Sequence, residues 1–341
     1  MARLVLHIGT HKTATTRIQN LFRHNHAILA RHGVIYPQFR RRHGHHPLVG
    51  VWNPRLCPDG DFDPRAAWAG LATAYADEDQ TVFLSSEEFS RLSPRRIDMA
   101  ELAELTAPFG EVRILCSLRN QAGFLQSVYQ EILKRQPTPI WEDIFETVMQ
   151  THMADGLTLD YDRLYSHLLG GFSRRQIRLI SYDAALHEED GIVGTYLRAL
   201  DLPLRQADLA PIPQRRANIS PPPLAAHAAA WLSRPEPPDP ALIRQVQRWI
   251  RAEYGPRLRT TLLTRAEQAR IAETFAPGNA ALARRIAQEQ PGFTIPPIPE
   301  TGIDLWRDDL PPDFWDRITQ RYRRPSRMRR AWRRLLAQRP E

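Results

Sequence analysis

The sequence predicts an α/β fold with a mainly parallel central sheet flanked by helices. Five short apolar runs, typical of buried strands, lie at residues 4–8, 34–36, 81–85, 112–118 and 177–182. Between these runs, apolar residues recur every three or four positions, as on one face of a helix: Ile18, Leu21 and Phe22, then Leu102 and Leu105, then Phe124, Val128 and Ile132. Apolar strands that alternate with helices form parallel sheets covered on both faces. Ligands of such sheets bind at the carboxyl ends of the strands.

The domain organisation follows from length and proline content. The 341 residues suffice for a large core, and we predict one main domain over residues 1–300 with a basic, Arg-rich C-terminal extension over 301–341. Ten prolines fall within residues 203–240, which predicts loop and extended segments that form a lid region. Helices are expected to resume at residues 241–253 and 265–290.

Composition favours a cytoplasmic protein. The longest apolar runs are far shorter than the roughly 20 residues that cross a bilayer, and the N-terminus lacks the pattern of a signal peptide. Cys57 and Cys116 are the only cysteines, too few for a disulfide framework.

The positive net charge of the chain predicts polyanionic partners. The formal net charge is +8, carried by 44 arginines and only two lysines, Lys12 and Lys134. A surviving lysine is notable because arginine cannot replace a compact ammonium where space is tight. Residues 321–339 hold nine arginines and no acid, with apolar residues between them. This segment is expected to rest on an anionic membrane surface or to dock on the protein's own core.

The segment after the first apolar run has the strand, loop and helix form of a phosphate cradle. Helix-start amides, hydroxyls and a lysine all favour an anion there. The loop differs from a Walker A loop, because Lys12 follows the only glycine, Gly9, by three residues and Ala14 stands where a second glycine would be. Threonines that simply cap the helix are the structural alternative.

The loop resembles the 5′-phosphosulfate loop of the sulfotransferase family, which has a lysine, a threonine, a small residue and two hydroxyl residues in that order. The matching residues are Lys12, Thr13, Ala14, Thr15 and Thr16, and we add His11 to the cofactor-binding set. Arg119 and Ser127, eight residues apart, resemble the family's 3′-phosphate site. Tyr182 resembles its strand-end tyrosine, which contacts adenine.

This resemblance implies a P-loop-like sulfotransferase fold and the use of 3′-phosphoadenosine 5′-phosphosulfate (PAPS). A sulfuryl group would pass to a hydroxyl or amine of a small-molecule or saccharide acceptor, adenosine 3′,5′-bisphosphate would be released, and no metal is expected. The glycine-rich closing motif of vertebrate members is missing. Arg215 and Arg216, in the proline-rich region, substitute for it or form a solvated basic turn.

The acceptor side is expected after the third strand. Glu87 resembles the catalytic glutamate of glycan-modifying members, with Lys12 neutralising the bridging oxygen of the leaving group. An arginine ion pair is the structural alternative for Glu87, and Glu88 is its neighbour. Two histidines after the second strand, His45 and His46, are alternative bases, with His43 beside them. A zinc site is disfavoured because no convincing ligand set accompanies these histidines.

Two other functions remain open. A nucleotide or small-molecule kinase with a non-standard phosphate loop would need ATP and Mg²⁺. A nonenzymatic nucleic-acid or membrane-surface module would depend on the arginine-rich tail and show steep salt dependence. We expect no specific nucleic-acid partner.

Overall fold

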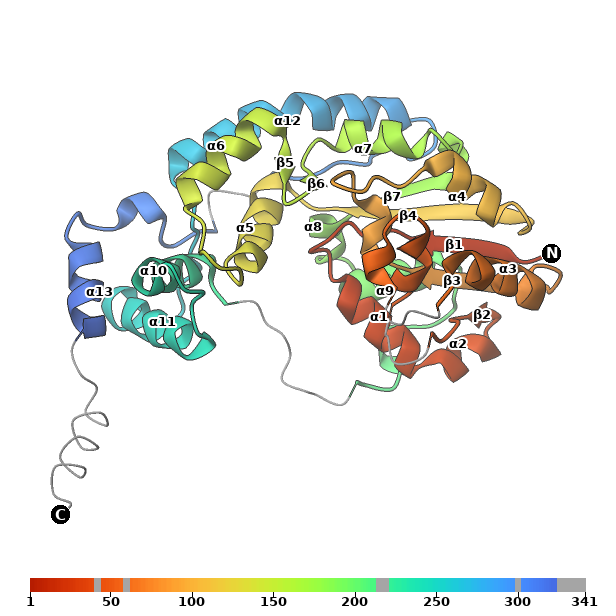
Figure 1. The fold of residues 1–341 in the computed structure, drawn as a ribbon, viewed down its shortest axis with the longest axis horizontal. Coiled ribbons are helices and arrows are strands. Elements are labelled where there is room, and N and C mark those ends of the chain that lie inside the picture. The colour runs from red at the N-terminus through yellow and green to blue at the C-terminus, as the bar shows by residue number, and fades with distance from the viewer. Residues whose placement is uncertain (40–43, 58–61, 213–220, 298–301, 324–341) are drawn as a thin grey trace, which may run out of the picture. The chain divides into compact units, whose positions relative to one another are not determined.

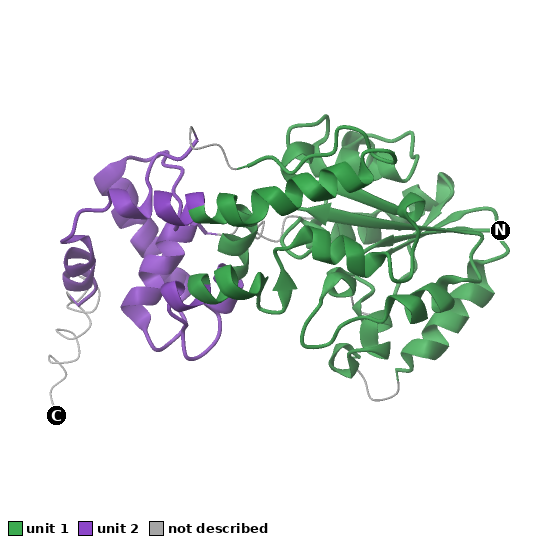
Figure 2. Ribbon diagram, turned by 90° about the horizontal axis from the view of Figure 1, so that it is seen from above, with its two compact units in different colours: residues 1–128, 145–218, 270–298 green, residues 129–144, 219–269, 299–341 purple. Residues whose placement is uncertain are grey.

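The computed structural model describes residues 1–39, 44–57, 62–212, 221–297 and 302–323 (Figure 1). The chain divides into two compact units (Figure 2). Unit 1 comprises residues 1–128, 145–218 and 270–298, and unit 2 comprises residues 129–144, 219–269 and 299–341. Each unit is described by itself.

Unit 1 contains the parallel sheet. Its strands are β1 (Arg3–His7), β2 (Val34–Ile35), β3 (Thr81–Ser85), β4 (Glu111–Leu118) and β7 (Ile177–Ser181), in the order β2-β3-β1-β4-β7. Every neighbouring pair is parallel. The predicted α/β fold is therefore confirmed, and each of the five apolar runs contains a strand. Because β1 is central, the loop that follows it lies between the carboxyl ends of β3 and β4.

Helices cover both faces of this sheet (Figure 1). On one face, Val5 and Phe83 pack with Ile18 of α1 (Thr15–His24) and Leu197 of α9 (Gly191–Ala199). On the other face, the alternate strand residues pack with α3 (Pro64–Tyr75), α4 (Met99–Thr106), α7 (Tyr161–Leu168) and α12 (Arg265–Ile286). Successive side chains of a strand point to opposite faces, so continuous apolar runs supply both cores.

Three of these helices begin at an aspartate cap. Asp63 accepts hydrogen bonds from two first-turn amides of α3, Asp98 does the same for α4, and Asp160 accepts one in α7. An aspartate at this position satisfies amides that the helix leaves unbonded. Apolar periodicity predicted α4, whereas it predicted neither α3 nor α7.

The remaining elements of unit 1 are short. They include α2 (His26–Arg31), α8 (Tyr182–Ala185), several 3₁₀ turns and a hairpin of β5 (Met153–Ala154) and β6 (Leu157–Thr158). Like α12, the helices α5 (Gln121–Ile132) and α6 (Trp141–Thr151) begin in one unit and end in the other.

Unit 2 contains a small helical core. Apolar residues of α10 (Pro223–Ser233), α11 (Pro240–Tyr254) and α13 (Phe314–Arg323) pack together. Part of the region 203–240, expected as loop and extended chain, is therefore the helix α10. Proline is tolerated in the first helical turn, where its missing N–H would have no partner, and alanines dominate the rest of α10. Residues 302–323, the described part of the predicted extension, belong to this unit.

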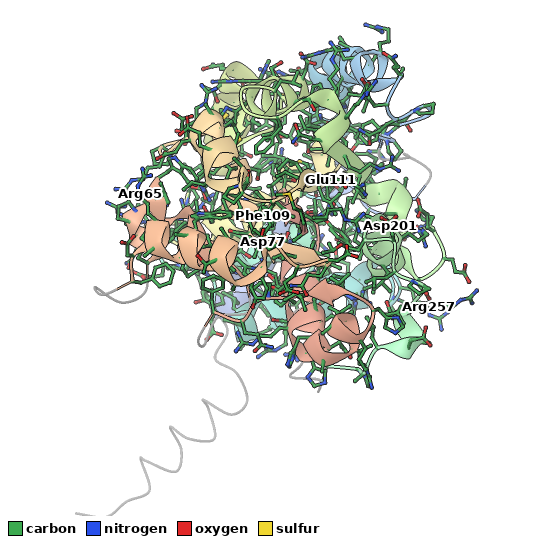
Figure 3. All side chains as sticks on the ribbon, turned by 90° about the vertical axis from the view of Figure 1, so that its right-hand side faces the viewer. Arg65, Asp77, Phe109, Glu111, Asp201 and Arg257 are labelled. Atoms are coloured by element: carbon green, nitrogen blue, oxygen red, sulfur yellow. The ribbon has the colours of Figure 1, made fainter. Side chains whose placement is uncertain are left out.

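The amino ends of the strands carry surface ion pairs. Arg3 Nη1 lies 2.6 Å from Asp201 Oδ2, and Arg113 Nη2 lies 2.9 Å from Glu111 Oε1. Figure 3 labels Glu111 and Asp201 on this side of the molecule. Exposed pairs of this kind contribute little to stability. Across the ranges that the structure covers, no helix is both long and apolar enough to span a membrane.

Candidate functional site

Residues that the sequence analysis selected follow four neighbouring strands at the same edge of the sheet. The loop with Lys12 follows β1, Glu87 follows β3, Arg119 follows β4 and Tyr182 follows β7. Parallel strands end at one edge, so segments far apart in the sequence meet there. This edge is our candidate site.

The loop after β1 has an unusual backbone. Lys12 and Ala14 adopt positive φ angles of 62° and 64°, a left-handed conformation that costs about 1–3 kcal/mol for residues other than glycine. Three threonine hydroxyls hold this shape: Thr10 donates to the Ser117 carbonyl at 3.0 Å, while Thr13 and Thr15 donate to the Thr10 carbonyl at 2.6 and 3.3 Å. Thr13 and Thr15 are buried and Thr16 is exposed. Loops in which left-handed residues interrupt the chain direct backbone amides toward anions.

Helix α1 starts without a compensating side chain. Its N-cap residue is Ala14, which offers no acceptor, and its first turn contains no acidic residue. The aspartate caps of α3, α4 and α7 show what this terminus lacks. The partial positive charge of a helix N-terminus favours an anion. The start of α1 therefore suits a phosphate or sulfate group.

Arg119 lies between the loop, α5 and Tyr182. Its Nη1 atom donates to Ser127 Oγ at 2.7 Å and to the Lys12 carbonyl at 3.3 Å. Its guanidinium carbon is 5.4 Å from the centre of the Tyr182 ring, within the range of a cation–π contact. The Arg119 Nε atom is buried and has no hydrogen-bond partner among the described residues. A buried donor without a partner is costly and points to a missing ligand or water.

Two residues that the sequence analysis did not select, Asn120 and Gly123, lie next to Arg119. A Cβ atom added at Gly123 would lie 3.0 Å from Arg119 Nε, so the glycine leaves room for the guanidinium. Asn120 Oδ1 accepts from the Gly123 backbone amide at 2.8 Å, and the backbone amide of Asn120 donates to Asp183 Oδ2 at 2.6 Å. A glycine early in a predicted helix was an available signal, because it costs stability unless space is needed.

Glu87 lies in a short 3₁₀ helix, Glu87–Ser90, that follows β3. Ser86 caps this turn by accepting from the Glu88 amide at 3.3 Å, which explains why the strand stops. Glu87 Oε2 accepts from Gln19 Nε2 at 3.0 Å and lies 3.9 Å from His46 Nε2. A Cβ atom added at Gly9 would lie 2.8 Å from Glu87 Cβ, so the loop after β1 packs directly on Glu87.

Glu88 forms the arginine ion pair that the sequence suggested as an alternative for Glu87. Arg91 Nε donates to Glu88 Oε2 at 2.8 Å, and His11 Nε2 lies 3.2 Å from Glu88 Oε1. Burial alone would raise the pKa of Glu88, but the hydrogen bond and charge of His11 and the charge of Arg91 outweigh it and lower the pKa to about 2. Glu88 is therefore ionised at neutral pH, and both of its carboxylate oxygens already have partners, Arg91 and His11.

The two described histidines after β2 differ in their surroundings. His45 is buried, with Nε2 2.8 Å from the Pro37 carbonyl and Nδ1 2.9 Å from the Ser85 amide nitrogen. Burial lowers the pKa of His45 to about 4, so it is neutral and both ring nitrogens are engaged. His46 is partly exposed, and its Nδ1 lies 2.8 Å from Ser86 Oγ. Of these two, His46 is the better placed beside Glu87.

A buried polar network lies under the site. His7 Nδ1 is 2.9 Å from Ser85 Oγ, His7 Nε2 is 2.7 Å from Tyr196 Oη, and Tyr196 Oη is 2.6 Å from Ser117 Oγ. His7 and Ser85 are the last residues of β1 and β3, and Ser117 precedes the last residue of β4. Burial lowers the pKa of His7 to about 3. The network joins the strand ends that lead to the loop, Glu87 and Arg119.

Some predicted residues lie outside the described ranges, namely His43, Arg215, Arg216 and residues 324–341. Within the described ranges, no three or more His, Cys, Asp or Glu side chains are grouped so that they could hold a metal ion. An open cavity of about 380 Å³ is lined by Arg175, Gln288 and Glu289, near the amino end of β7. It shares no residue with the candidate site.

Comparisons with known proteins give little further information. No family model and no curated protein matches the chain. The structure is similar to the crystal structure of a sulfotransferase from Alicyclobacillus acidocaldarius, with 15% sequence identity and a TM-score of 0.43, over 83% of this chain and 94% of that chain. A likeness of this size does not establish a function.

Proposed function

We propose that this chain is a PAPS-dependent sulfotransferase that acts on a hydroxyl or amine of an acceptor, either a saccharide or another small molecule. The observation that carries the proposal is the pair of anion-binding features at one sheet edge. One is the loop of Lys12 with the uncapped start of α1, and the other is Arg119 with its unsatisfied Nε atom. A nucleotide with phosphate groups at both its 5′ and 3′ positions needs two such features.

The residues present fit the nucleotide. The loop amides, Lys12 and the start of α1 would hold the 5′-phosphosulfate, and Arg119 with Ser127 would hold the 3′-phosphate. Tyr182, 5.4 Å from the Arg119 guanidinium, would stack against the adenine. PAPS supplies a sulfuryl group on a good leaving group. The chain then has to orient it, offset the charge that develops and remove the acceptor's proton.

In this proposal Lys12 offsets the negative charge of the leaving group and Glu87 removes the proton of the acceptor. The Lys12 ammonium offsets negative charge at the 5′ end, where a compact cation on the loop is needed. Glu87 removes the acceptor's proton, because its carboxylate is oriented by Gln19 at 3.0 Å, whereas Glu88 is held by Arg91. His46, 3.9 Å from Glu87, is the second candidate for the base. We assign His45 a structural role because both of its ring nitrogens are bonded.

A kinase is the second candidate function, and the partners of the acidic residues disfavour it. Mg²⁺ in such sites is bound by carboxylates together with the phosphates. Glu88 is bonded to His11 and Arg91, and Asp183 to the Asn120 amide. Glu87 accepts from Gln19, so each of these three carboxylates already has a hydrogen-bond donor.

A ligand screen tests the proposal. A ligand that binds only the folded state raises the free energy of unfolding, by about 2.7 kcal/mol when present at a hundred times its Kd. We expect adenosine 3′,5′-bisphosphate to raise the melting temperature more than AMP or ATP with Mg²⁺ at equal concentration. If ATP with Mg²⁺ stabilises most, the kinase is correct and the sulfotransferase is wrong.

The cytoplasmic location and the membrane contact of residues 321–339 stay predictions. Removing residues 325–341 distinguishes the two interpretations of the tail. Loss of binding to anionic vesicles with unchanged melting supports membrane contact, whereas a lower melting temperature without vesicle binding supports docking on the protein.

A further inference from the structure

His11 is held by a charged cluster beside the candidate site. Its Nε2 atom lies 3.2 Å from Glu88 Oε1 and 3.4 Å from Arg91 Nη2. Arg91 in turn donates to Glu88 and, at 2.7 Å, to the carbonyl of Asp155 in the turn of the β5–β6 hairpin. The His11, Glu88 and Arg91 side chains are only 14%, 18% and 18% exposed. The imidazole is therefore held by the segment that carries Glu88 and Arg91, and the hairpin in turn holds Arg91.

These contacts determine which ring nitrogen carries a proton. The Glu88 carboxylate is ionised at neutral pH and can only accept hydrogen bonds. His11 Nε2 therefore carries a hydrogen that it donates to Glu88, in preference to accepting one from Arg91 at the longer distance. In a neutral ring, Nδ1 is then left with a bare lone pair.

The Nδ1 atom of His11 is buried and has no hydrogen-bond partner among the residues that the structure describes. A buried polar atom without a partner usually marks a place for a ligand or water. His11 directly precedes Lys12 in the loop. The charged side chains that contact its ring are Glu88 and Arg91, and the same segment carries Glu87, while Arg91 bonds to the carbonyl of Asp155. An oxyanion cannot donate to a lone pair, so it requires a hydrogen on Nδ1.

We propose that His11 binds the oxyanion held by the loop and takes up one proton when it does so. The imidazolium then donates from Nδ1 to an anion oxygen and from Nε2 to Glu88. The identification of that anion as the phosphosulfate rests on the proposed function, whereas the coupling to a proton applies to any oxyanion in the loop. Glu88 and Arg91 act as positioning residues for His11.

Calorimetry on the full chain tests this coupling. Binding of adenosine 3′,5′-bisphosphate is measured between pH 7.5 and 9 in two buffers with different heats of ionisation, a range in which phosphate groups are already fully charged because their second pKa is about 6. We expect proton uptake approaching one per bound nucleotide, and a Kd that rises by up to about tenfold per pH unit. Inorganic sulfate, whose charge is constant over this range, is tested in parallel by its effect on the melting temperature.

The variants separate His11 from other titrating groups. His11→Gln retains a hydrogen-bond donor that does not titrate, so proton uptake should disappear and the nucleotide should bind about 10- to 100-fold more weakly at pH 7.5. Glu88→Gln should reduce proton uptake at pH 8, because the imidazolium loses its counter-charge. His24→Gln, on the exposed end of α1, is the matched control and should behave as the wild type.

Each outcome decides between the two proposals. Nucleotide binding without proton uptake, or with uptake that His11→Gln retains, overturns the role of His11 and leaves the proposed function standing. Proton-coupled stabilisation by sulfate, lost in His11→Gln, without nucleotide binding, supports His11 and contradicts the proposed function. If neither ligand binds, both proposals are wrong.

Discussion

Arg119 Nη1 lies 2.7 Å from Ser127 Oγ, and the two residues belong to different segments, the end of β4 and the middle of α5. The hydroxyl holds one end of the guanidinium while the Nε atom at the other end has no partner among the described residues. The arginine is thus positioned in advance for a ligand, and a phosphate oxygen near Nε would supply the missing acceptor.

Arg119→Ala should weaken binding of adenosine 3′,5′-bisphosphate much more than binding of AMP. Hydrogen bonds to charged groups contribute about 1.5–3 kcal/mol, which corresponds to a loss of about 10- to 100-fold in affinity. Ser127→Ala should act in the same direction with a smaller effect. Calorimetry with both nucleotides measures the difference, and equal losses for both would remove the 3′-phosphate assignment.

Gly123→Ala should weaken the same nucleotide without unfolding the protein. The new methyl group would lie 3.0 Å from Arg119 Nε and 3.1 Å from Asn120 Oδ1, so the guanidinium has to move. The control is Gly70→Ala in α3, where no heavy atom lies within 4 Å of the added Cβ. That change should raise stability by about 1 kcal/mol and leave affinity unchanged. Equal affinity in the two variants would show that Gly123 does not position Arg119.

Lys12→Arg and Lys12→Ala should both lose most of the turnover. A planar guanidinium does not fit where a compact ammonium is required, and removal of a group that stabilises developing charge costs about 10²–10³ in rate. Lys134→Arg is a natural control, since this lysine is 68% exposed and pairs with Glu131 at 2.5 Å. Near wild-type turnover in Lys12→Arg would show that this lysine has no special role.

Glu87→Gln should lose turnover by about 10²–10⁴, the usual effect of removing a general base, while nucleotide affinity stays within about twofold of the wild type, a change of about 0.4 kcal/mol. The same change at His46 tests the second candidate. If Glu87→Gln retains activity and His46→Gln abolishes it with nucleotide binding intact, the base is His46.

Stability should fall as the pH is lowered from about 6.5 toward 4. Burial lowers the pKa of His7 to about 3 and of His45 to about 4, whereas the same groups in the unfolded chain titrate near 6.5. In this window the unfolded state binds more protons, so acid favours unfolding, by about 1.4 kcal/mol per pH unit for each such group. Urea unfolding at several pH values measures the slope, and His45→Gln should reduce it by about one proton. A stability that is constant from about pH 6.5 to 4.5 would contradict the buried, neutral state of these histidines.

The strands were predictable from the sequence because buried parallel strands are continuous apolar runs. The residues that follow them were predictable as a group because parallel strands end together. The turn at Glu87 was not, since it depends on the hydrogen bond from the Glu88 amide to Ser86 Oγ. Helix α10 was not predicted because it begins at prolines, and prolines occur in loops as well as in the first turn of a helix.

The partners within the site could not be predicted from the sequence. Gln19 reaches Glu87, and His11 reaches Glu88, only after helix α1 and the loop after β1 have packed on the sheet. The same holds for the histidines that follow β2. His45 and His46 are adjacent in sequence, yet one is buried with both nitrogens bonded and the other lies beside Glu87. Local pattern does not distinguish them, because the difference arises from tertiary contacts.

The most direct test of the central claim is transfer of a sulfur label from PAPS to an acceptor. The purified chain is incubated with labelled PAPS and a panel of saccharides and amines, and both labelled acceptor and released adenosine 3′,5′-bisphosphate are measured. We expect equal amounts of the two products with the wild type and neither with Lys12→Ala. Transfer of phosphate from ATP with Mg²⁺, with no sulfur transfer to any acceptor, would contradict the account.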